Sequence, residues 1–405
     1  MREKPLKKTP KNKKPELLAP AGSFPMLVAA INAGADAVYF GLKEFSMRAN
    51  AKNFEIKDLE EIQKICSKKN IKKYITLNTI IYDNEIPRIE KILKKIKKHI
   101  DAVICWDLSI IELCRKNKIP FHVSTQASIA NTESARFYQK LGAERIVLAR
   151  ELNLNQIKKI SKNLPKLGIE CFIHGAMCVA VSGRCFTSQF LFNCSANRGR
   201  CIQPCRRTYT ITDEENNQSK IENSRVMSAK DLCTLPFIEK IKKAGITSFK
   251  IEGRNRDARY VDKVVRIYRK ALDNKLTKTE TNKLIKELEK VYNRKFSSGF
   301  YIKSPTPDDF SDTENSSAKE KKHFIGLVTH YYDKIGVATI KLSSDIKLND
   351  KIVIIGKTTG IIETKADYIE SQKKPIKKAS RPEEIGIKIP NRVRKNDEVY
   401  KIIKR

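Results

Sequence analysis

Eight short apolar runs, each followed by a helical pattern, constrain the fold of this chain more than any other feature of its sequence. Runs that are apolar throughout are typical of strands buried on both faces of a parallel sheet. The predicted strands cover residues 16–19, 37–41, 74–78, 102–106, 121–124, 145–149, 170–173 and 248–252, and amphipathic helices between them include 58–69, 85–98 and 153–162. Eight such alternations predict an α/β fold, a closed (β/α)8 TIM-like barrel over residues 15–302. An open doubly wound sheet is the alternative.

The spacing of the predicted strands is interrupted once, between the seventh strand and the eighth. Earlier strand starts are 19 to 37 residues apart, whereas the step from Glu170 to Ser248 is 78 residues. The extra sequence, residues 175–225, holds five cysteines. It follows the C-terminal end of a strand, which is the face where TIM-barrel enzymes build their active sites. We therefore expect a cysteine-rich insertion at the site of chemistry.

The pattern changes on both sides of the barrel. Residues 1–14 include seven Lys or Arg and are predicted to be a disordered basic tail. A helix is predicted over 277–292, and 303–322 reads as a linker rich in Pro, Asp, Ser and Lys. From 323 to 405, short alternating strands at 324–329, 335–341, 351–355 and 398–403 predict a small C-terminal β-barrel.

The charge of the chain indicates an anionic partner. The sequence has 81 Lys and Arg against 46 Asp and Glu, a formal net charge of +35, and such a field attracts polyanions. A general enrichment in Ile, Lys and Asn accounts for part of this excess. No apolar run approaches the roughly 20 residues that span a bilayer, and the N-terminus has no secretory signal. We expect a cytoplasmic protein that binds nucleic acid and no membrane.

Four cysteines of the insertion form the most specific constellation in the chain. Cys178, Cys185, Cys201 and Cys205 are spaced C-x6-C-x15-C-x3-C, and four thiolates complete either a zinc site or an iron-sulfur cluster. Only the last pair has the tight spacing of structural zinc sites, so the loose first pair favours a cluster without excluding zinc. Of the other cysteines, we expect Cys66, Cys105 and Cys114 to be buried small hydrophobic residues. Cys171, Cys194 and Cys233 are near enough in sequence to be spare ligands, which is the less favoured role for each.

Several motifs together resemble one known family. They lie at 170–178, 182–185 and 197–206 around the cysteines, and at 18–23, 35–41, 48–54, 77–79, 124–126, 147–151 and 250–254 along the barrel. Over nearly the whole chain they resemble the collagenase-like peptidase family of unknown catalytic type, peptidase family U32. Despite this name, the resemblance implies iron-sulfur proteins that add hydroxyl groups without molecular oxygen. These include tRNA 5-hydroxyuridine synthases, a 23S rRNA cytidine hydroxylase and ubiquinone-pathway hydroxylases.

Within this family the chain is most similar to the tRNA branch, because of its closing Cys201-x3-Cys205 pair and its C-terminal β-barrel. That resemblance implies a 4Fe-4S cluster on the four cysteines and 5-hydroxyuridine formation at the wobble position of tRNA. It also implies prephenate as a co-substrate and tRNA as the partner. A second subunit of the same family is a further candidate partner, and the sequence identifies no electron donor.

Polar residues at or just beyond the predicted strand ends are the candidates for the rest of the site. We expect catalytic candidates at His174, Glu252, Asn78 and Gln126, and substrate-binding arginines at Arg48, Arg150 and Arg254. Arg48 or Arg254 would suit the two carboxylates of prephenate through bidentate pairing. Each of these residues could instead be a structural hydrogen bonder at a strand end.

Arginine is prominent near the cysteines and after the last barrel strand, although lysine dominates elsewhere. This reversal indicates planar donors for phosphate. The RNA-binding candidates are Arg198, Arg200, Arg206 and Arg207 in the insertion, and Arg254, Arg256, Arg259, Lys263 and Arg266 after the last strand. For Arg259, Lys263 and Arg266, a solvated helix face is the alternative.

Three other functions remain open. A peptidase would use Ser182 with His174, or His174 with Glu170, but the spacing matches no recognised triad or zincin motif. An oxygen-independent hydroxylase could act on rRNA cytidine or a quinone precursor instead of tRNA. A zinc-stabilised RNA-binding module would need no chemistry at all.

Overall fold

The computed structural model describes residues 14–219 and 227–405, so the predicted basic tail at 1–14 lies outside it except for Lys14. Eight parallel strands form a closed barrel, because β11 pairs with both β7 and β1. The strands are β1 (Glu16–Pro20), β2 (Ala37–Gly41), β3 (Lys72–Thr76), β4 (Ala102–Cys105), β5 (Phe121–Val123), β6 (Arg145–Val147), β7 (Gly168–Gly175) and β11 (Ser248–Ile251). The predicted TIM-like barrel is confirmed, and the open sheet is wrong.

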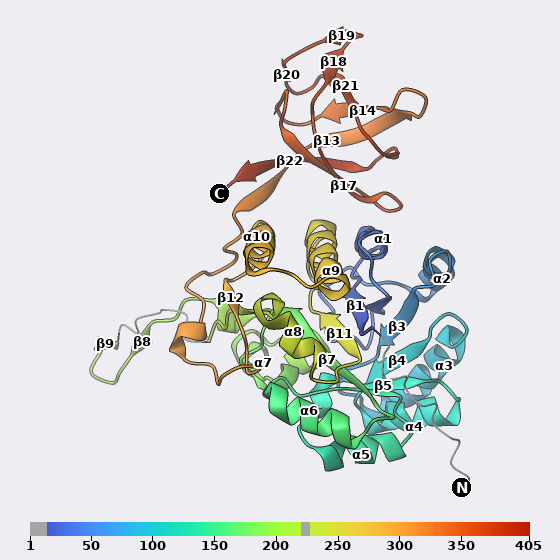
Figure 1. Cartoon of the computed structure of the whole chain (residues 1–405), viewed down its shortest axis with the longest axis vertical. Helices are drawn as coiled ribbons and strands as arrows, with labels where there is room; N and C mark the ends of the chain where they lie inside the picture. The colour runs from blue at the N-terminus through green and yellow to red at the C-terminus, as the bar shows by residue number, and fades with distance from the viewer. Residues whose placement is uncertain (1–13, 220–226) are drawn as a thin grey trace.

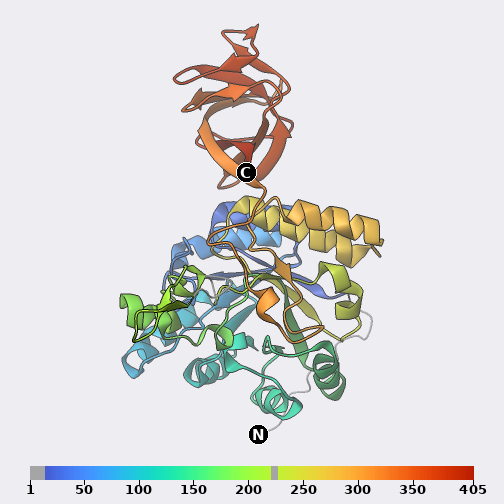
Figure 2. The same cartoon turned by 90° about the vertical axis from the view of Figure 1, so that its left-hand side faces the viewer.

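Helices surround the strands as a ring (Figure 2). They are α1 (Phe24–Asn32), α2 (Leu59–Ser67), α3 (Ile86–Ile96), α4 (Leu108–Lys116), α5 (Thr132–Lys140), α6 (Leu154–Asn163), α8 (Ile238–Lys242) and α9 (Ala258–Asp273). In α3, Ile89, Leu93 and Ile96 are buried while the lysines between them face water, as the 3.6-residue period requires. The Asn153 and Asp257 side chains cap α6 and α9 by accepting a backbone N–H.

The insertion follows β7 at the C-terminal end of the barrel strands and extends towards the left of Figure 1. It contains α7 (Thr187–Phe192), the short turns η4 (Val181–Gly183), η5 (Ala196–Arg198) and η6 (Pro204–Arg206), and a hairpin of β8 (Ile211–Thr212) and β9 (Gln218–Ser219). Backbone hydrogen bonds from Ala49 N to Gly199 O (3.1 Å) and from Ile80 N to Asn197 O (3.3 Å) fix it to the barrel. The end of β7 also pairs antiparallel with β10 (Asp231–Cys233), a strand that the sequence pattern did not predict.

The predicted linker at 303–322 is more ordered than its composition suggests. It follows α10 (Lys278–Leu288) and β12 (Phe296–Ser297) and contains the turn η8 (Pro307–Asp309). Ser311 is fully buried, and its N–H donates to Ser228 O (2.6 Å). The first strand of the second domain begins at Glu320, three residues before the predicted boundary. This segment is therefore packed on the barrel, because its backbone groups find partners there.

The C-terminal domain is an antiparallel β structure with its own core of Ile and Val. Its eight-stranded sheet contains β13 (Glu320–Tyr332), β14 (Val337–Leu342), β16 (Lys351–Gly356), β17 (Gly360–Lys365), β18 (Ile369–Ser371), β19 (Lys374–Pro375), β21 (Glu384–Lys388) and β22 (Glu398–Lys404). A smaller sheet pairs β15 (Ile346–Lys347) with β20 (Lys378–Ala379). Within the described residues no helix is long and apolar enough to cross a membrane.

Buried ion pairs join the two domains along α9 and β17, where Figure 1 shows the second domain seated over α1 and α9. The Arg259 side chain is only 4% exposed and pairs with Glu320 and with Glu363 (3.4 Å). Lys263 also pairs with Glu363, at 3.8 Å. These two residues were predicted to bind RNA, and the structure corrects this, because both are occupied by carboxylates of the second domain. Arg266 pairs with Asp262 one turn earlier, on the exposed side of the helix.

Replacing Arg259 with methionine should destabilise the protein strongly. The change removes the buried cation and leaves Glu320 with Lys351 at 3.7 Å and Glu363 with Lys351 at 2.5 Å, so we expect a loss of about 3 kcal/mol, the low end for a broken buried pair. Urea unfolding would measure the loss. Arg266→Met on the same helix is the matched control and should change stability by less than about 1 kcal/mol, because its ion pair is exposed. Equal effects of the two substitutions would show that Arg259 does not hold the domains together.

Candidate active site at the mouth of the barrel

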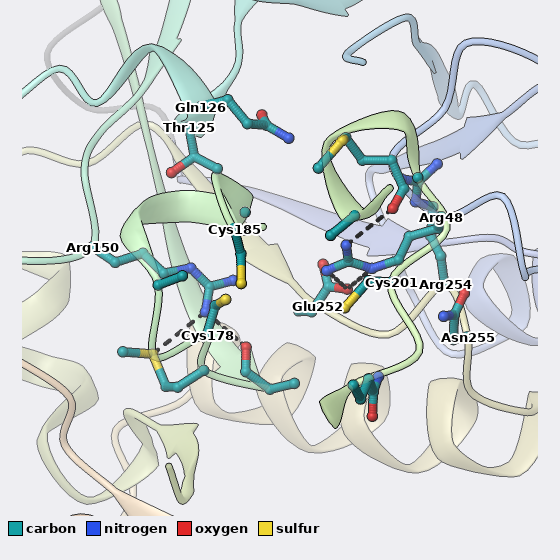
Figure 3. Close-up of a pocket in the computed structure, with 18 of the residues that line it drawn as sticks. Arg48, Thr125, Gln126, Arg150, Cys178, Cys185, Cys201, Glu252, Arg254 and Asn255 are labelled. Atoms are coloured by element: carbon teal, nitrogen blue, oxygen red, sulfur yellow. Dashed lines mark hydrogen bonds and ion pairs between the residues drawn. The ribbon is translucent and has the colours of Figure 1, made fainter. Parts of the chain in front are cut away.

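A pocket lies between the C-terminal ends of the barrel strands and the insertion (Figure 3). The barrel contributes a polar floor, and the insertion contributes the opposite wall. The main lining residues are Tyr39, Arg48, Thr76, Asn78, Gln126, Arg150, Lys250, Glu252 and Arg254 from the barrel and Cys178, Cys185, Cys201 and Cys205 from the insertion. Two groups that lie far apart in the sequence therefore share one cavity, as TIM-barrel active sites do.

The insertion holds its thiols with short polar contacts. The Cys185 N–H donates to Asn197 Oδ1 (3.0 Å), and the Thr187 N–H donates to the Cys185 sulfur (3.4 Å). Ser188 Oγ lies 3.9 Å from the Cys201 sulfur. Burial raises the pKa of the Cys205 thiol, so a bound cation would be needed to keep this residue deprotonated.

A single metal ion and an iron-sulfur cluster require different spacings of their cysteine ligands. Within the described residues, no three His, Cys, Asp or Glu side chains lie together as the ligands of one metal ion would. The sulfurs around a tetrahedral zinc ion are about 3.8 Å apart, because each Zn–S bond is about 2.3 Å. In an iron-sulfur cluster each cysteine binds its own iron, so the sulfurs lie further apart. The four cysteines line one pocket and, among the described residues, are not gathered as the ligands of one metal ion would be.

The other six cysteines lie outside this pocket. Cys66, Cys105 and Cys114 are buried in the barrel core, as predicted. Cys171 and Cys233 are buried in the same core, where burial raises the pKa of the Cys233 thiol to about 11. Cys194 belongs to the insertion but does not line the pocket. The sequence position of these last three cysteines suggested spare ligands, and the structure does not bring them to the four.

Glu252 organises the floor of the pocket. Arg48 donates to Glu252 Oε1 through Nε (3.1 Å) and Nη2 (3.0 Å), and the Tyr39 hydroxyl donates to Oε2 (3.2 Å). Burial would raise the pKa of Glu252, but the charges of Arg48, Arg150 and Arg254 outweigh it and lower the pKa to about 2. The carboxylate is therefore ionised at neutral pH and is a weak base. Its position suits it to hold arginines rather than to remove protons.

The pocket floor carries more positive than negative charge. Arg254 Nη1 donates to Ser46 Oγ (2.7 Å) and Thr76 Oγ1 (2.8 Å), and burial lowers its pKa to about 10. Arg150 donates to Ala176 O (2.7 Å) and stacks on Phe172 at 3.9 Å, so neither guanidinium is paired with a carboxylate from residues 14–219 or 227–405. Lys250 is neutralised by Glu170 at 2.8 Å. Among the described residues that line the pocket, three guanidiniums of the floor face the single carboxylate of Glu252, which leaves an excess of positive charge that an anion would balance.

The structure brings most of the predicted site residues together. Arg48, Asn78, Gln126, Arg150, Glu252 and Arg254 all line the pocket. Asn78 Oδ1 accepts from Met47 N (3.2 Å), and Gln126 accepts from the Ser124 hydroxyl. The sequence pattern missed Tyr39, because it lies inside an apolar run that reads as core. It missed Lys250 for the same reason.

His174 is an exception to this grouping. It is 2% exposed and lies among Tyr260, Tyr268 and Phe296 rather than in the pocket. Burial lowers its pKa to about 4, so the ring is neutral at physiological pH. Its proposed partner Glu170 is held by Lys250 and Arg145 at the other end of the barrel interior, and the Ser182 side chain lies outside the described part of the chain. The prediction of His174 as a catalytic residue is therefore corrected.

The arginines of the insertion divide into two classes. Arg198 binds both oxygens of Glu85 and stacks on Tyr82, and Arg206 is buried and donates to Met177 O and Ala229 O. Arg198 therefore fixes the insertion to the barrel, and Arg206 joins the beginning of the insertion to the segment after it, so both predicted RNA ligands are engaged by groups of the protein. Arg200 and Arg207 are exposed. Arg256, after the last strand, stacks on Tyr292 at 3.4 Å.

Comparison with known proteins extends these observations. The chain is 42% identical to an uncharacterized protease of Methanocaldococcus jannaschii, covering 95% of this chain and 97% of that protein. It is 39% identical to a collagenase of Porphyromonas gingivalis over 96% and 98% of the two chains. It is also 35% identical to the tRNA hydroxylation protein P1 of Bacillus subtilis, over 85% and 84%. The sequence profile of peptidase family U32 matches residues 22–310. The chain therefore belongs to peptidase family U32.

Proposed function

We propose that this chain is an iron-sulfur-dependent RNA hydroxylase that works without molecular oxygen and forms 5-hydroxyuridine at the wobble position of tRNA. One observation carries the proposal: four cysteines and an arginine-rich floor line the same pocket at the mouth of a barrel. The relative named for tRNA hydroxylation, matched over most of both chains, supports tRNA as the substrate. On this proposal the protein works in the cytoplasm, with a second family subunit as a candidate partner and an unidentified electron donor.

Cys178, Cys185, Cys201 and Cys205 would hold a 4Fe-4S cluster. When bound, such a cluster transfers electrons or activates an oxygen-donating molecule. The chain's own residues then position the reactants. The pocket admits a base only when that base is turned out of its stack, and the side-chain amides of Asn78 and Gln126 at the strand ends offer donors and acceptors for the edge of a uracil.

The excess positive charge of the floor supports prephenate as a co-substrate. Arg48 is already paired with Glu252, whereas Arg150 and Arg254 bind neutral oxygen or sulfur atoms. Arg150 and Arg254 are therefore the better candidates for the two carboxylates, because they lie in the same cavity and have no carboxylate partner of their own. This assignment keeps Arg254 from the sequence-based hypothesis and replaces Arg48 with Arg150.

Nucleoside analysis of bulk tRNA tests the proposal directly. A strain that lacks this chain should lose 5-hydroxyuridine and its methoxy and carboxymethoxy derivatives, because hydroxylation precedes both derivatives. Expression of the full chain should restore them. Mass spectrometry of digested tRNA is the measurement, with an unrelated modified nucleoside as the internal control. An unchanged nucleoside profile in the deletion strain would overturn the assignment.

The second candidate is a peptidase, which the collagenase relative favours. The geometry gives it less support, because His174 is buried away from the pocket and Glu170 is occupied by Lys250 and Arg145. Thiolates that bind a cluster are also unavailable as nucleophiles. Cleavage of gelatin by the purified chain, unaffected by removal of iron, would favour this candidate.

A further inference from the structure

An exposed aromatic cluster covers helix α7, beside the pocket. Phe190 is 85% exposed and Phe186 is 64% exposed, and their ring centroids are 6.3 Å apart. Leu191 and Phe192 on the same short helix are exposed as well. Single exposed apolar residues are ordinary, but a contiguous group of aromatic rings on a surface marks a binding site. We call Phe186, Phe190 and Phe192 the α7 aromatic face.

The surroundings of this face are cationic. From Cys171 to Thr212 the sequence contains five arginines and no Asp or Glu. Arg207 lies 4.4 Å from the Phe192 ring centroid, and Arg184 lies 4.8 Å from that of Trp106. Both guanidiniums are exposed. Glu44 and Glu85 lie near Gln189 of α7 but are paired with Arg88 and Arg198. Aromatic rings beside exposed planar cations are the combination that binds unpaired bases and phosphates.

The position of the α7 aromatic face connects it to the pocket. Val179, Cys185 and Thr187 line the pocket, and α7 begins at Thr187. A nucleotide turned into the pocket would therefore place its neighbours over this helix. A second copy of the chain would place its own exposed arginines against those around the face, and with a formal net charge of +35 on each chain the two copies would repel each other. RNA instead supplies flat bases for the rings and negative charge for the arginines.

We infer that the α7 aromatic face is a stacking platform for the unpaired nucleotides that flank the target base. The inference rests on the proposed function, because it takes RNA as the substrate. It specifies that the platform recognises a single-stranded loop of the RNA and not a duplex. Phe186 and Phe190 stack on bases, and Arg184 and Arg207 bind the adjoining phosphates. The platform thus selects a loop and directs one base of it into the pocket.

Fluorescence anisotropy with a labelled anticodon stem-loop RNA tests the platform on the full chain purified without oxygen. Phe186→Ala with Phe190→Ala should weaken loop binding by about 25-fold or more, since each stacked ring accounts for about fivefold or more. Binding of a blunt duplex of the same length should not change. Phe190→Trp should retain loop binding, because a larger ring still stacks. Phe137→Ala is the matched control, since Phe137 is 56% exposed on α5 and lies outside the pocket.

The outcomes separate this inference from the proposed function. Loop binding equal to wild type in the double variant would overturn the platform, and the deletion strain's tRNA would still decide the hydroxylase assignment. Loss of self-association in the double variant, measured by sedimentation, would instead make the face an interface between copies and would also overturn the inference. A selective loss of loop binding, with an unchanged melting temperature, supports it.

Discussion

A protein with serine in place of Cys201 should be colourless, should contain little iron and should fail to restore tRNA hydroxylation in a deletion strain. Cys201 lines the pocket with three other cysteines, and an oxygen ligand is a poor substitute for thiolate in an iron-sulfur cluster. With one ligand of four lost, we expect activity to fall below detection. Iron analysis and visible absorbance of anaerobically purified protein give a readout that does not depend on substrate.

Cys194→Ser is the matched control for this experiment. Cys194 belongs to the same insertion and is partly exposed, as Cys201 is, but it does not line the pocket. This variant should keep both iron and activity. Full activity of the Cys201 variant would remove the cluster from the mechanism. Stoichiometric zinc without iron in the wild type would favour the zinc-stabilised RNA-binding module instead.

The barrel could be predicted from the sequence because its strands are buried on both faces. A run such as Ala37–Gly41 is apolar throughout, and its start and end therefore stand out against the amphipathic helices. The position of the cysteine insertion could be predicted as well, because the interval between the seventh and eighth predicted strands is longer than the other intervals. Strand β10 was missed because it is three residues long and includes the buried Asp231, which pairs with Arg294.

The roles of individual arginines could not be predicted in the same way. An arginine that binds phosphate and one that binds a distant carboxylate look alike in sequence. Arg198 meets Glu85 across 113 residues, and Arg259 meets Glu363 across 104 residues. Long-range pairs of this kind depend on the packing of elements, which local pattern does not encode. Arg200 and Arg207 could be recognised as the exposed arginines of the insertion only when the structure showed the partners of Arg198 and Arg206.

The orientation of the His174 side chain could not be predicted for a different reason. Glu170 and Phe172 face the barrel interior, and strict alternation along β7 would send His174 the same way. The pairing of β7 with β11 shifts register between Lys250 and Ile251, so that Ile251 lies opposite His174 rather than opposite Ile173. A bulge of this kind changes the direction of the following side chain. His174 consequently points among tyrosines outside the pocket, and a local sequence pattern does not reveal such a bulge.

Replacing Glu252 with glutamine should destabilise the protein and disorder the pocket floor. The Arg48–Glu252 ion pair would be broken, and Arg150 and Arg254 would lose the negative charge of Glu252 that acts on them, which together costs about 3–5 kcal/mol. The two hydrogen bonds from Arg48 to Oε1 would no longer be made to a charged acceptor. The side chains of the pocket floor should therefore shift, and we expect hydroxylation to fall about 100-fold. Urea unfolding at pH 6 and the tRNA nucleoside assay measure the two effects. Glu55→Gln is the control, because Glu55 also has a pKa of about 2 but is exposed to solvent between Lys43 and Lys57, so its loss should change stability little.

The pH dependence of the difference in unfolding free energy between wild type and Glu252→Gln shows whether the charge of Glu252 causes that difference. The pKa of Glu252 is lowered from 4.5 to about 2 on folding, so its ionised form stabilises the native state above pH 4.5, and this contribution is lost as the pH falls towards 2. The gap in unfolding free energy between wild type and the glutamine variant should therefore be largest at neutral pH and should shrink by about 3 kcal/mol on acidification. A gap that stays constant with pH would mean that the carboxylate acts through shape alone. The negative charge of Glu252 holds Arg48 and offsets the charges of Arg150 and Arg254. A difference in unfolding free energy that disappears in acid would therefore show that this charge both stabilises the barrel mouth and sets the charge of the proposed substrate-binding floor.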